Sequence, residues 1–356
     1  MSTPLVDTLR RLLDAPAPSG FETAASRVWR EIASDFASEV WTDASGNAYA
    51  AAGDGDGPTV MLAGHIDEIG LMVHYIDDDG YLFVRGVGGW DPQVLVGQRV
   101  DILARDGVVS GVIGRRAIHL VESDDRGKAV KLKDLWVDIG AADADEARQR
   151  VSIGDVGVIR SDTLQMGETR VAARSIDDRA GAAVALEALR RIVERGSAAR
   201  VVAVATAQEE ISFRSGGGAR TSSFGLDPDA AIVIDVTHAT DHPHIDKKEH
   251  GDIRLGSGPV LNRGAVIHPL VLEGLRAAAA EADIEVQWQA APSATGTDAD
   301  SIFTSRAGIP TAVVSIPNRY MHSPNQLIDL GDLDAAAELI AGYLVALEED
   351  ATFAPA

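Results

Sequence analysis

Four apolar runs constrain the fold of this chain more than any other feature of its sequence. Each run is rich in valine, isoleucine and alanine, and segments with helical spacing separate the runs. Such runs are typical of strands buried in a parallel sheet, because helices cover both faces of that sheet. The runs are residues 59–64, 200–207, 230–234 and 311–317. The sequence therefore predicts an α/β fold with a mixed, largely parallel central sheet flanked by helices.

The segment from residue 73 to residue 171 has a different pattern. Short alternating strands and many glycines replace the long apolar runs, and one helix is expected near residues 143–149. We therefore expect a small inserted all-β domain at residues 73–171. The catalytic domain is then discontinuous and comprises residues 1–72 and 172–356.

Helices are expected in several segments outside this insertion. Two are predicted within residues 3–36, one begins at Asp177 and Asp178, and two more are predicted at residues 268–282 and 333–347. In addition, the glycine- and aspartate-rich segment 53–58 predicts a hairpin turn.

The composition excludes several classes of protein. The 356 residues include no cysteine, which excludes disulfide frameworks, zinc ribbons and thiol nucleophiles. The formal charge of −22 would repel nucleic acids and anionic membranes. No segment has the roughly 18–20 uncharged residues of a membrane span, and the N-terminal segment lacks the pattern of a signal peptide. We therefore expect a cytoplasmic protein with neither a nucleic-acid nor a membrane partner.

Residues of the types that bind metals follow each of the four apolar runs. In chain order they are His65, the pair Glu209 and Glu210, Asp235 and His322. In open α/β sheets, ligands bind beyond the carboxyl ends of the strands, so these side chains are expected to meet at one edge of the sheet. Taken alone, each has an ordinary structural explanation as well, such as a hydrogen-bonded histidine or a solvated carboxylate.

Two further acids extend the set. Asp67 lies two residues after His65 and could orient its ring, whereas Asp177 could either cap a helix or bridge two metals. The adjacent carboxylates of Glu209 and Glu210 repel each other unless a cation or a shared proton compensates their charge. One of them could bind a metal while the other takes a proton from the bound water, and with Glu210 counted as a ligand, Glu209 is the candidate general base. The candidate ligands are thus His65, Asp177, Glu210, Asp235 and His322. Two imidazoles and three carboxylates suit zinc, cobalt or manganese better than calcium.

Six motifs, in this order, resemble those of the tetrahedral and glutamyl aminopeptidases, metallopeptidase family forty-two. They are Leu-Ala-Gly-His-Ile-Asp-Glu-Ile-Gly-Leu-Met-Val (62–73), Ser-Ile-Asp-Asp-Arg-Ala-Gly (175–181), Ala-Thr-Ala-Gln-Glu-Glu (205–210), Ile-Asp-Val-Thr-His-Ala-Thr-Asp (234–241), Thr-Gly-Thr-Asp-Ala (295–299) and Arg-Tyr-Met-His-Ser-Pro (319–324). The resemblance begins at residues 16–22 and includes two segments of the insertion, residues 88–100 and 134–141.

This resemblance implies a zinc-peptidase-like fold and a metal-dependent aminopeptidase that acts on short peptides with a free N-terminus. It implies two divalent ions per subunit, zinc or cobalt before manganese, with Asp177 bridging them. His65 and Asp235 would hold one ion, and Glu210 and His322 the other. Asp67 would orient His65, and Glu209 would be the general base and later the proton donor. The insertion would mediate dimerisation and assembly into a homo-oligomer, commonly a dodecamer.

Some features depart from the family pattern or leave alternatives open. The segment 211–220 after Glu210 is a few residues longer than in related sequences, which could reshape the substrate pocket. The histidines at 238, 242, 244 and 250 are either solvated loop side chains or a third metal site. A dinuclear deacylase or carboxypeptidase acting on N-acylated small molecules, and a noncatalytic assembly protein of the same fold, are the alternative functions.

Overall fold

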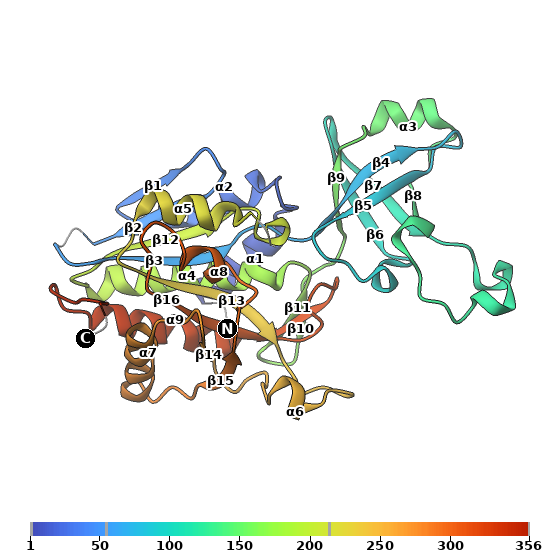
Figure 1. Ribbon diagram of the computed structural model, residues 1–356. Coiled ribbons are helices and arrows are strands. Elements are labelled where there is room, and N and C mark those ends of the chain that lie inside the picture. The colour runs from blue at the N-terminus through green and yellow to red at the C-terminus, as the bar shows by residue number, and fades with distance from the viewer. Residues whose placement is uncertain (1–2, 54–55, 213–214, 355–356) are drawn as a thin grey trace.

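An eight-stranded mixed sheet forms the centre of the larger part of the molecule (Figure 1). The computed structural model describes residues 3–53, 56–212 and 215–354. The strand order is β1 (Glu39–Thr42), β2 (Ala48–Ala52), β12 (Arg200–Thr206), β3 (Thr59–His65), β13 (Ala230–His238), β16 (Thr311–Asn318), β14 (Val260–Gly264) and β15 (Gln287–Ala291). The four central strands β12, β3, β13 and β16 are mutually parallel and correspond to the four apolar runs. The expected parallel core of the sheet is therefore confirmed.

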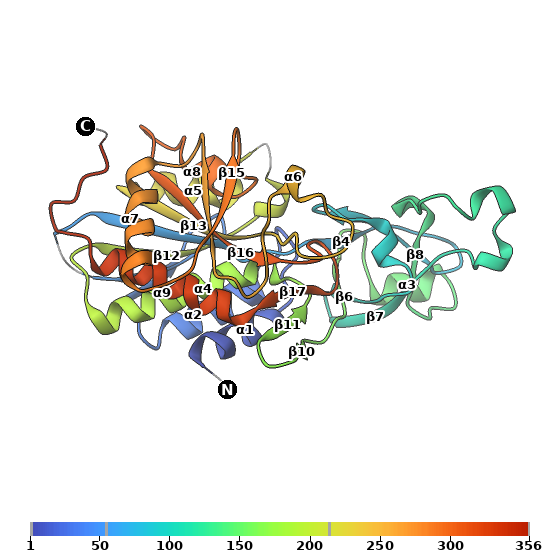
Figure 2. The same ribbon diagram turned by 90° about the horizontal axis from the view of Figure 1, so that it is seen from below.

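Helices cover both faces of this sheet, as the unbroken apolar character of its central strands requires. On one face, α4 (Ile176–Arg195) contacts β3, β12 and β13 and packs beside α1 and α9. On the other face lie α5 and α8 (Figure 2). The remaining bounds are α1 (Pro4–Asp14), α2 (Thr23–Ala33), α5 (Gly217–Leu226), α6 (Lys247–His250), α7 (Pro269–Glu281), α8 (Ala299–Ile302) and α9 (Leu330–Val345).

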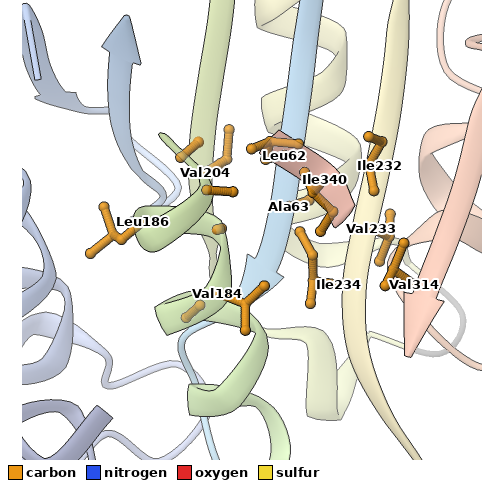
Figure 3. Packing of buried hydrophobic residues seen from close by; sticks show 14 of the residues in the cluster. Leu62, Ala63, Val184, Leu186, Val204, Ile232, Val233, Ile234, Val314 and Ile340 are labelled. Atoms are coloured by element: carbon orange, nitrogen blue, oxygen red, sulfur yellow. The ribbon is translucent and has the colours of Figure 1, made fainter. Parts of the chain in front are cut away.

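The main hydrophobic core lies between the sheet and helices α4 and α9. Leu62 and Ile232 come from neighbouring strands, and Val184 and Ile340 come from the two helices (Figure 3). All four side chains are fully buried. This packing holds the central strands in fixed register, and so it fixes where their carboxyl ends lie.

A closed barrel projects from one end of the main body (Figure 1). Its strands, in the order in which they pair, are β4 (Gly70–Ile76), β5 (Leu82–Val87), β8 (Trp136–Asp138), β7 (Gly107–Gly114), β6 (Arg99–Ala104) and β9 (Val156–Ile159). The barrel has its own buried core and carries α3 (Ala144–Arg150), close to the helix expected there. Short 3₁₀ helices lie at η1 (Pro92–Leu95), η2 (Ile118–Leu120), η3 (Ser123–Asp125) and η4 (Leu132–Asp134).

A small three-stranded sheet joins the chain leaving the barrel to the main body. It consists of β10 (Leu164–Met166), β11 (Arg170–Ala173) and β17 (Gln326–Asp329), with β11 in the centre. The last strand comes from the C-terminal part of the chain, directly before α9. Segments about 160 residues apart in sequence are thus paired next to the barrel.

Two local expectations are wrong, and both errors have the same cause. Residues 54 and 55 of the expected hairpin turn lie outside the described residues, but β2 and β3 on either side of it are not neighbours, because β12 lies between them. Likewise, β13 does not end at Asp235 but continues to His238, since its pairing with β16 extends that far. In both cases long-range strand pairing overrides the local pattern. Among the described residues, no helix is long and apolar enough to cross a membrane.

Candidate metal centre

The candidate ligands lie around the carboxyl ends of the parallel strands. His65 is the last residue of β3, Asp235 lies inside β13, and His322 follows β16 by four residues. After β12, Gln208 adopts a left-handed backbone conformation with φ of 63° and turns the chain into the short helix η5 (Glu209–Ile211). Because the strand has ended there, the side chains of Glu209 and Glu210 need not point to opposite faces of the sheet, as adjacent residues of a strand do.

Asp177 lies between two groups of possible ligands. In the first group, the ligand atoms of His65, Asp177 and Asp235 lie within 4.8 Å of one another; in the second, those of Asp177, Glu210 and His322 do so. The Oδ1 atom of Asp177 is 3.0 Å from His65 Nε2, and its Oδ2 atom is 3.4 Å from His322 Nε2. The two oxygens of one carboxylate therefore face two different imidazoles.

The spacing of these atoms would allow them to share a metal ion. Two ligand atoms that are each about 2.0–2.1 Å from zinc in tetrahedral geometry lie roughly 3.3 Å from each other. The distances from Asp177 to the two imidazoles are close to this value, and His322 Nε2 is 3.3 Å from Glu210 Oε2. In addition, the buried Oε1 atom of Glu210 has no hydrogen-bond partner in the described part of the chain. An unpaired buried carboxylate oxygen is costly, and a cation would compensate it.

Asp67 holds both sides of the site together. Its Oδ1 atom is 3.4 Å from His65 Nδ1, and its backbone carbonyl oxygen is 3.2 Å from the same nitrogen. The carboxylate also accepts hydrogen bonds of 3.1 Å from the backbone N–H groups of Glu209 and Glu210. This fully buried side chain thus fixes the turn after β12 relative to the end of β3.

Asp178 has a structural role, and the sequence pattern did not distinguish this role from that of the neighbouring Asp177. Its Oδ2 atom accepts the backbone N–H of His65 at 3.1 Å, and its Oδ1 atom accepts that of Gly181 at 2.9 Å. The second bond is of the type that caps a helix, and it lies at the start of the regular part of α4. The peptide bond between Asp177 and Asp178 is cis.

The electrostatics of the site reflect a surplus of buried carboxylates. Burial raises the pKa of Glu209 to about 10, and nearby acids such as Asp235 add to this effect. Hydrogen bonds to Asp177 and Glu210 raise the pKa of His322 to about 11. Burial lowers the pKa of His65, but its hydrogen bonds to Asp177 and Asp67 outweigh burial and hold it well above the usual value. Divalent cations would supply the positive charge that bound protons supply in their absence.

The site opens into a cavity of about 400 Å³. Residues of both ligand groups line it, together with Glu209, Ser212, Gly89 from the barrel side, and Thr297, Asp298 and Ser301 from the segment around α8. The fully buried Asp298 accepts a hydrogen bond from Thr206, and burial raises its pKa to about 6. Asp298 lies in one of the sequence motifs, but no local pattern gave it a role.

A larger cavity of about 620 Å³ lies near the amino ends of β13 and β16, opposite the ligand groups. The histidines at positions 238, 242, 244 and 250 form no ligand group within the described ranges. Two residues of the segment 211–220, at positions 213 and 214, lie outside the described residues, and α5 begins at Gly217.

Histidines and carboxylates at the carboxyl ends of buried strands thus form a candidate metal centre on an α/β sheet. The family model for M42 glutamyl aminopeptidase matches residues 46–339. The chain is 36% identical over 347 residues to a lysyl aminopeptidase of Pyrococcus furiosus, covering 96% of this chain and 97% of that protein. It is 26% identical to a glutamyl aminopeptidase of Lactococcus lactis, with 97% of each chain covered.

The solved structures that are similar to this chain are also aminopeptidases or peptidases. The TET aminopeptidase of a marine sediment Thaumarchaeota archaeon has a TM-score of 0.91 at 34% identity, with 97% of this chain and 96% of that chain covered. The TET1 peptidase of Pyrococcus horikoshii, described as assembling into a tetrahedron or a large octahedral shell, has a TM-score of 0.84 at 29% identity, with coverage of 96% and 100%. The chain therefore belongs to the M42 glutamyl aminopeptidase family and is a peptide hydrolase. Membership in this metallopeptidase family implies divalent metal ions.

Proposed function

We propose that this chain is a dinuclear metallo-aminopeptidase that removes the N-terminal residue from short peptides. The observation that carries the proposal is the position of Asp177, whose two oxygens face His65 and His322 separately. A carboxylate placed in this way can bind two cations, one through each oxygen. Family membership supports the hydrolysis of peptides, and the two ligand groups that share Asp177 support the number of ions.

The proposed ligands follow from the two groups. His65 and Asp235 would hold one ion, Glu210 and His322 would hold the other, and Asp177 would be shared. Zinc or cobalt, followed by manganese, suits two imidazoles and three carboxylates. When bound, the two ions polarise the scissile carbonyl and lower the pKa of the attacking water.

Glu209 is the proposed general base. It lines the cavity but belongs to neither ligand group, and its Oε2 atom is 3.9 Å from His65 Nε2. Burial and neighbouring acids raise the pKa of Glu209 when no cation is near, and cations held by the adjacent ligands would lower it again and leave the carboxylate ionised. The ionised Glu209 would then accept a proton from the attacking water and later donate it to the leaving amine. Asp67 keeps the imidazole of His65 oriented throughout.

The barrel is the proposed oligomerisation domain. Large apolar side chains are exposed on it, including Val108 and Val112 on β7 and Leu120 in η2, which is 71% exposed. Exposed apolar side chains of this kind are common at contacts between protein chains. We propose a dimer-based dodecamer, because the solved structure of PhTET1-12s, 28% identical to this chain, is described as a dodecamer. Light scattering after size-exclusion chromatography tests this, and a monomer at micromolar concentration would contradict it.

A panel of peptides tests the proposed reaction. Protein reloaded with zinc or cobalt is incubated with peptides whose N-terminal residues are charged, aliphatic or aromatic, and released amino acids are measured. The same peptides with an acetylated N-terminus form the matched set. Hydrolysis of free but not of acetylated peptides is expected. Release from acetylated substrates would instead support the deacylase alternative, and no hydrolysis of either set would support the noncatalytic one.

A further inference from the structure

The barrel contributes a turn to the metal centre, formed by Gly88, Gly89 and Trp90 directly after β5. The carbonyl oxygen of Gly89 is 2.8 Å from Nδ1 of His322 and belongs to the lining of the cavity. Because a carbonyl oxygen can only accept a hydrogen bond, Nδ1 carries the proton of this bond. In the neutral ring the lone pair is then on Nε2, which faces Asp177 and Glu210.

The two histidines of the site are held in different ways. His65 is 2% exposed, and Asp67 in the same segment of the main body holds its Nδ1 atom. The side chain of His322 is 35% exposed, so the surrounding packing restrains its ring less than that of His65. Within the described residues, the Gly89 carbonyl is the hydrogen-bond partner of its Nδ1 atom, and this partner is 233 positions away in the barrel.

The same turn also lies close to Glu210. A Cβ atom added at Gly88 would lie 3.5 Å from Glu210 Cβ and only 2.6 Å from Ile69 Cγ2, so the backbone approaches this region too closely for any side chain. Its φ of 76° also requires glycine. The barrel turn therefore hydrogen-bonds His322 and lies close to Glu210, the two ligands that belong to the second group alone.

Trp90 fixes this turn to the barrel. Its indole Nε1–H donates a hydrogen bond of 2.8 Å to the carbonyl oxygen of Gly70, the first residue of β4. Its ring packs against the barrel core. The side chain of Trp90 thus anchors the residue directly after Gly89, and within the described part of the chain it makes no hydrogen bond or ion pair with either ligand group.

We infer that Trp90 is a positioning residue for the second metal site: it holds the Gly89 carbonyl, which orients His322. The inference rests on the proposed function, since it assumes that Glu210 and His322 bind an ion. It assigns the barrel a part in the chemistry of the site in addition to any part in assembly. It also predicts an asymmetry, because loosening the turn weakens one metal site and leaves the other intact.

Trp90→Phe tests the inference, because it removes the N–H donor and keeps an aromatic ring. Trp136→Phe is the matched control: Trp136 lies in the same barrel, in edge contact with Tyr81 at 6.2 Å between ring centroids. Metal-free protein is titrated with Zn²⁺ by calorimetry, and the absorption spectrum of bound Co²⁺ is recorded. Thermal unfolding of the metal-free variants checks that the barrel remains folded.

We expect wild type and Trp136→Phe each to bind two ions, and we expect the affinity of each site to be the same in the two proteins. In Trp90→Phe, one site should be unchanged and the other weakened about tenfold, the lower end of the effect of losing an outer hydrogen-bond partner of a ligand. The Co²⁺ spectrum should change for the weakened site alone. Should Trp90→Phe be poorly folded, Gly88→Ala replaces it, since the φ of 76° at Gly88 and an added Cβ only 2.6 Å from Ile69 Cγ2 would displace the turn, and the same weakening of one site is expected.

The inference would be overturned if the folded variant bound both ions with equally reduced affinity, or both with unchanged affinity. Such a result would leave the proposed function intact as long as wild type still bound two ions. If wild type itself bound fewer than two ions, the proposed function would fail instead. The two failures are therefore distinguishable in one titration series.

Discussion

Replacing Glu68 by glutamine should destabilise the protein strongly, although Glu68 belongs to neither ligand group. Its buried carboxylate accepts hydrogen bonds from Ala17 N–H at 3.0 Å, from Arg179 Nη2 at 3.4 Å and from Arg174 Nη1. Arg179 is itself fully buried and also donates to the carbonyl oxygen of Ala15. Glu68 therefore ties the end of α1 and the start of α4 to the segment that carries Asp67.

The expected cost follows from the charge that the substitution leaves behind. Burial lowers the pKa of Arg179 to about 10 even with Glu68 beside it, which shows how much the buried guanidinium depends on its counter-charge. Removing one partner of a buried ion pair typically costs about 3–5 kcal/mol, because the remaining charge is uncompensated. We expect Glu68→Gln to lower the free energy of unfolding by about this amount.

The measurement is urea unfolding of metal-free protein at neutral pH, at a fixed protein concentration. Glu31→Gln is the control, because the pair of Arg11 and Glu31 is 3.6 Å apart and about half exposed. Such surface pairs contribute about 0–1 kcal/mol. If Glu68→Gln lost no more unfolding free energy than Glu31→Gln, the reasoning about the buried pair would be refuted.

Three further predictions concern the metal centre. Glu209→Gln should lower kcat by at least about 100-fold, as expected for loss of a general base, while elemental analysis finds the same metal content; a loss of bound metal would contradict its placement outside the ligand groups. Asp177→Asn should weaken both metal sites, and Asp235→Asn only one, which calorimetric titration distinguishes; equal effects would contradict sharing by Asp177. The metal-free protein should lose stability as the pH rises from about 6 to 10. Glu209 and His322 have pKa values raised to about 10 and 11, so both bind protons more tightly when folded, and that stabilisation is lost as the pH approaches these values. Thermal unfolding with and without Zn²⁺ checks this, and a metal-free protein whose melting temperature increased over this range would show that the sign is wrong.

The central strands could be predicted from the sequence because burial on both faces leaves a local signature. The runs that became β3 and β12 contain almost no polar residue before they end, which only a strand covered on both sides tolerates. The order of the strands carries no such signature. The insertion of β12 between β2 and β3 depends on pairing between segments about 150 residues apart, and so the expected hairpin at residues 53–58 was wrong.

The candidate ligands could be predicted from the sequence for a related reason. Parallel strands deliver the residues that follow them to a common edge, so His65 and Glu210 could be linked without knowledge of their distance. Resemblance to a family then divided the candidates between two ions. The roles of Glu68, Asp178 and Asp298 were not predicted, because an acid used for packing and an acid used for catalysis look the same in sequence.

The sequence by itself determined the residue types, the parallel strands and the end of the sheet at which the chemistry would lie. These properties depend on side-chain periodicity and on the chemical nature of single residues, both of which are local. Only the tertiary structure decided that Asp177 faces two imidazoles and that a barrel carbonyl meets His322. Contacts of this kind depend on the relative placement of elements far apart in the chain, which packing of the whole molecule fixes and no local pattern encodes.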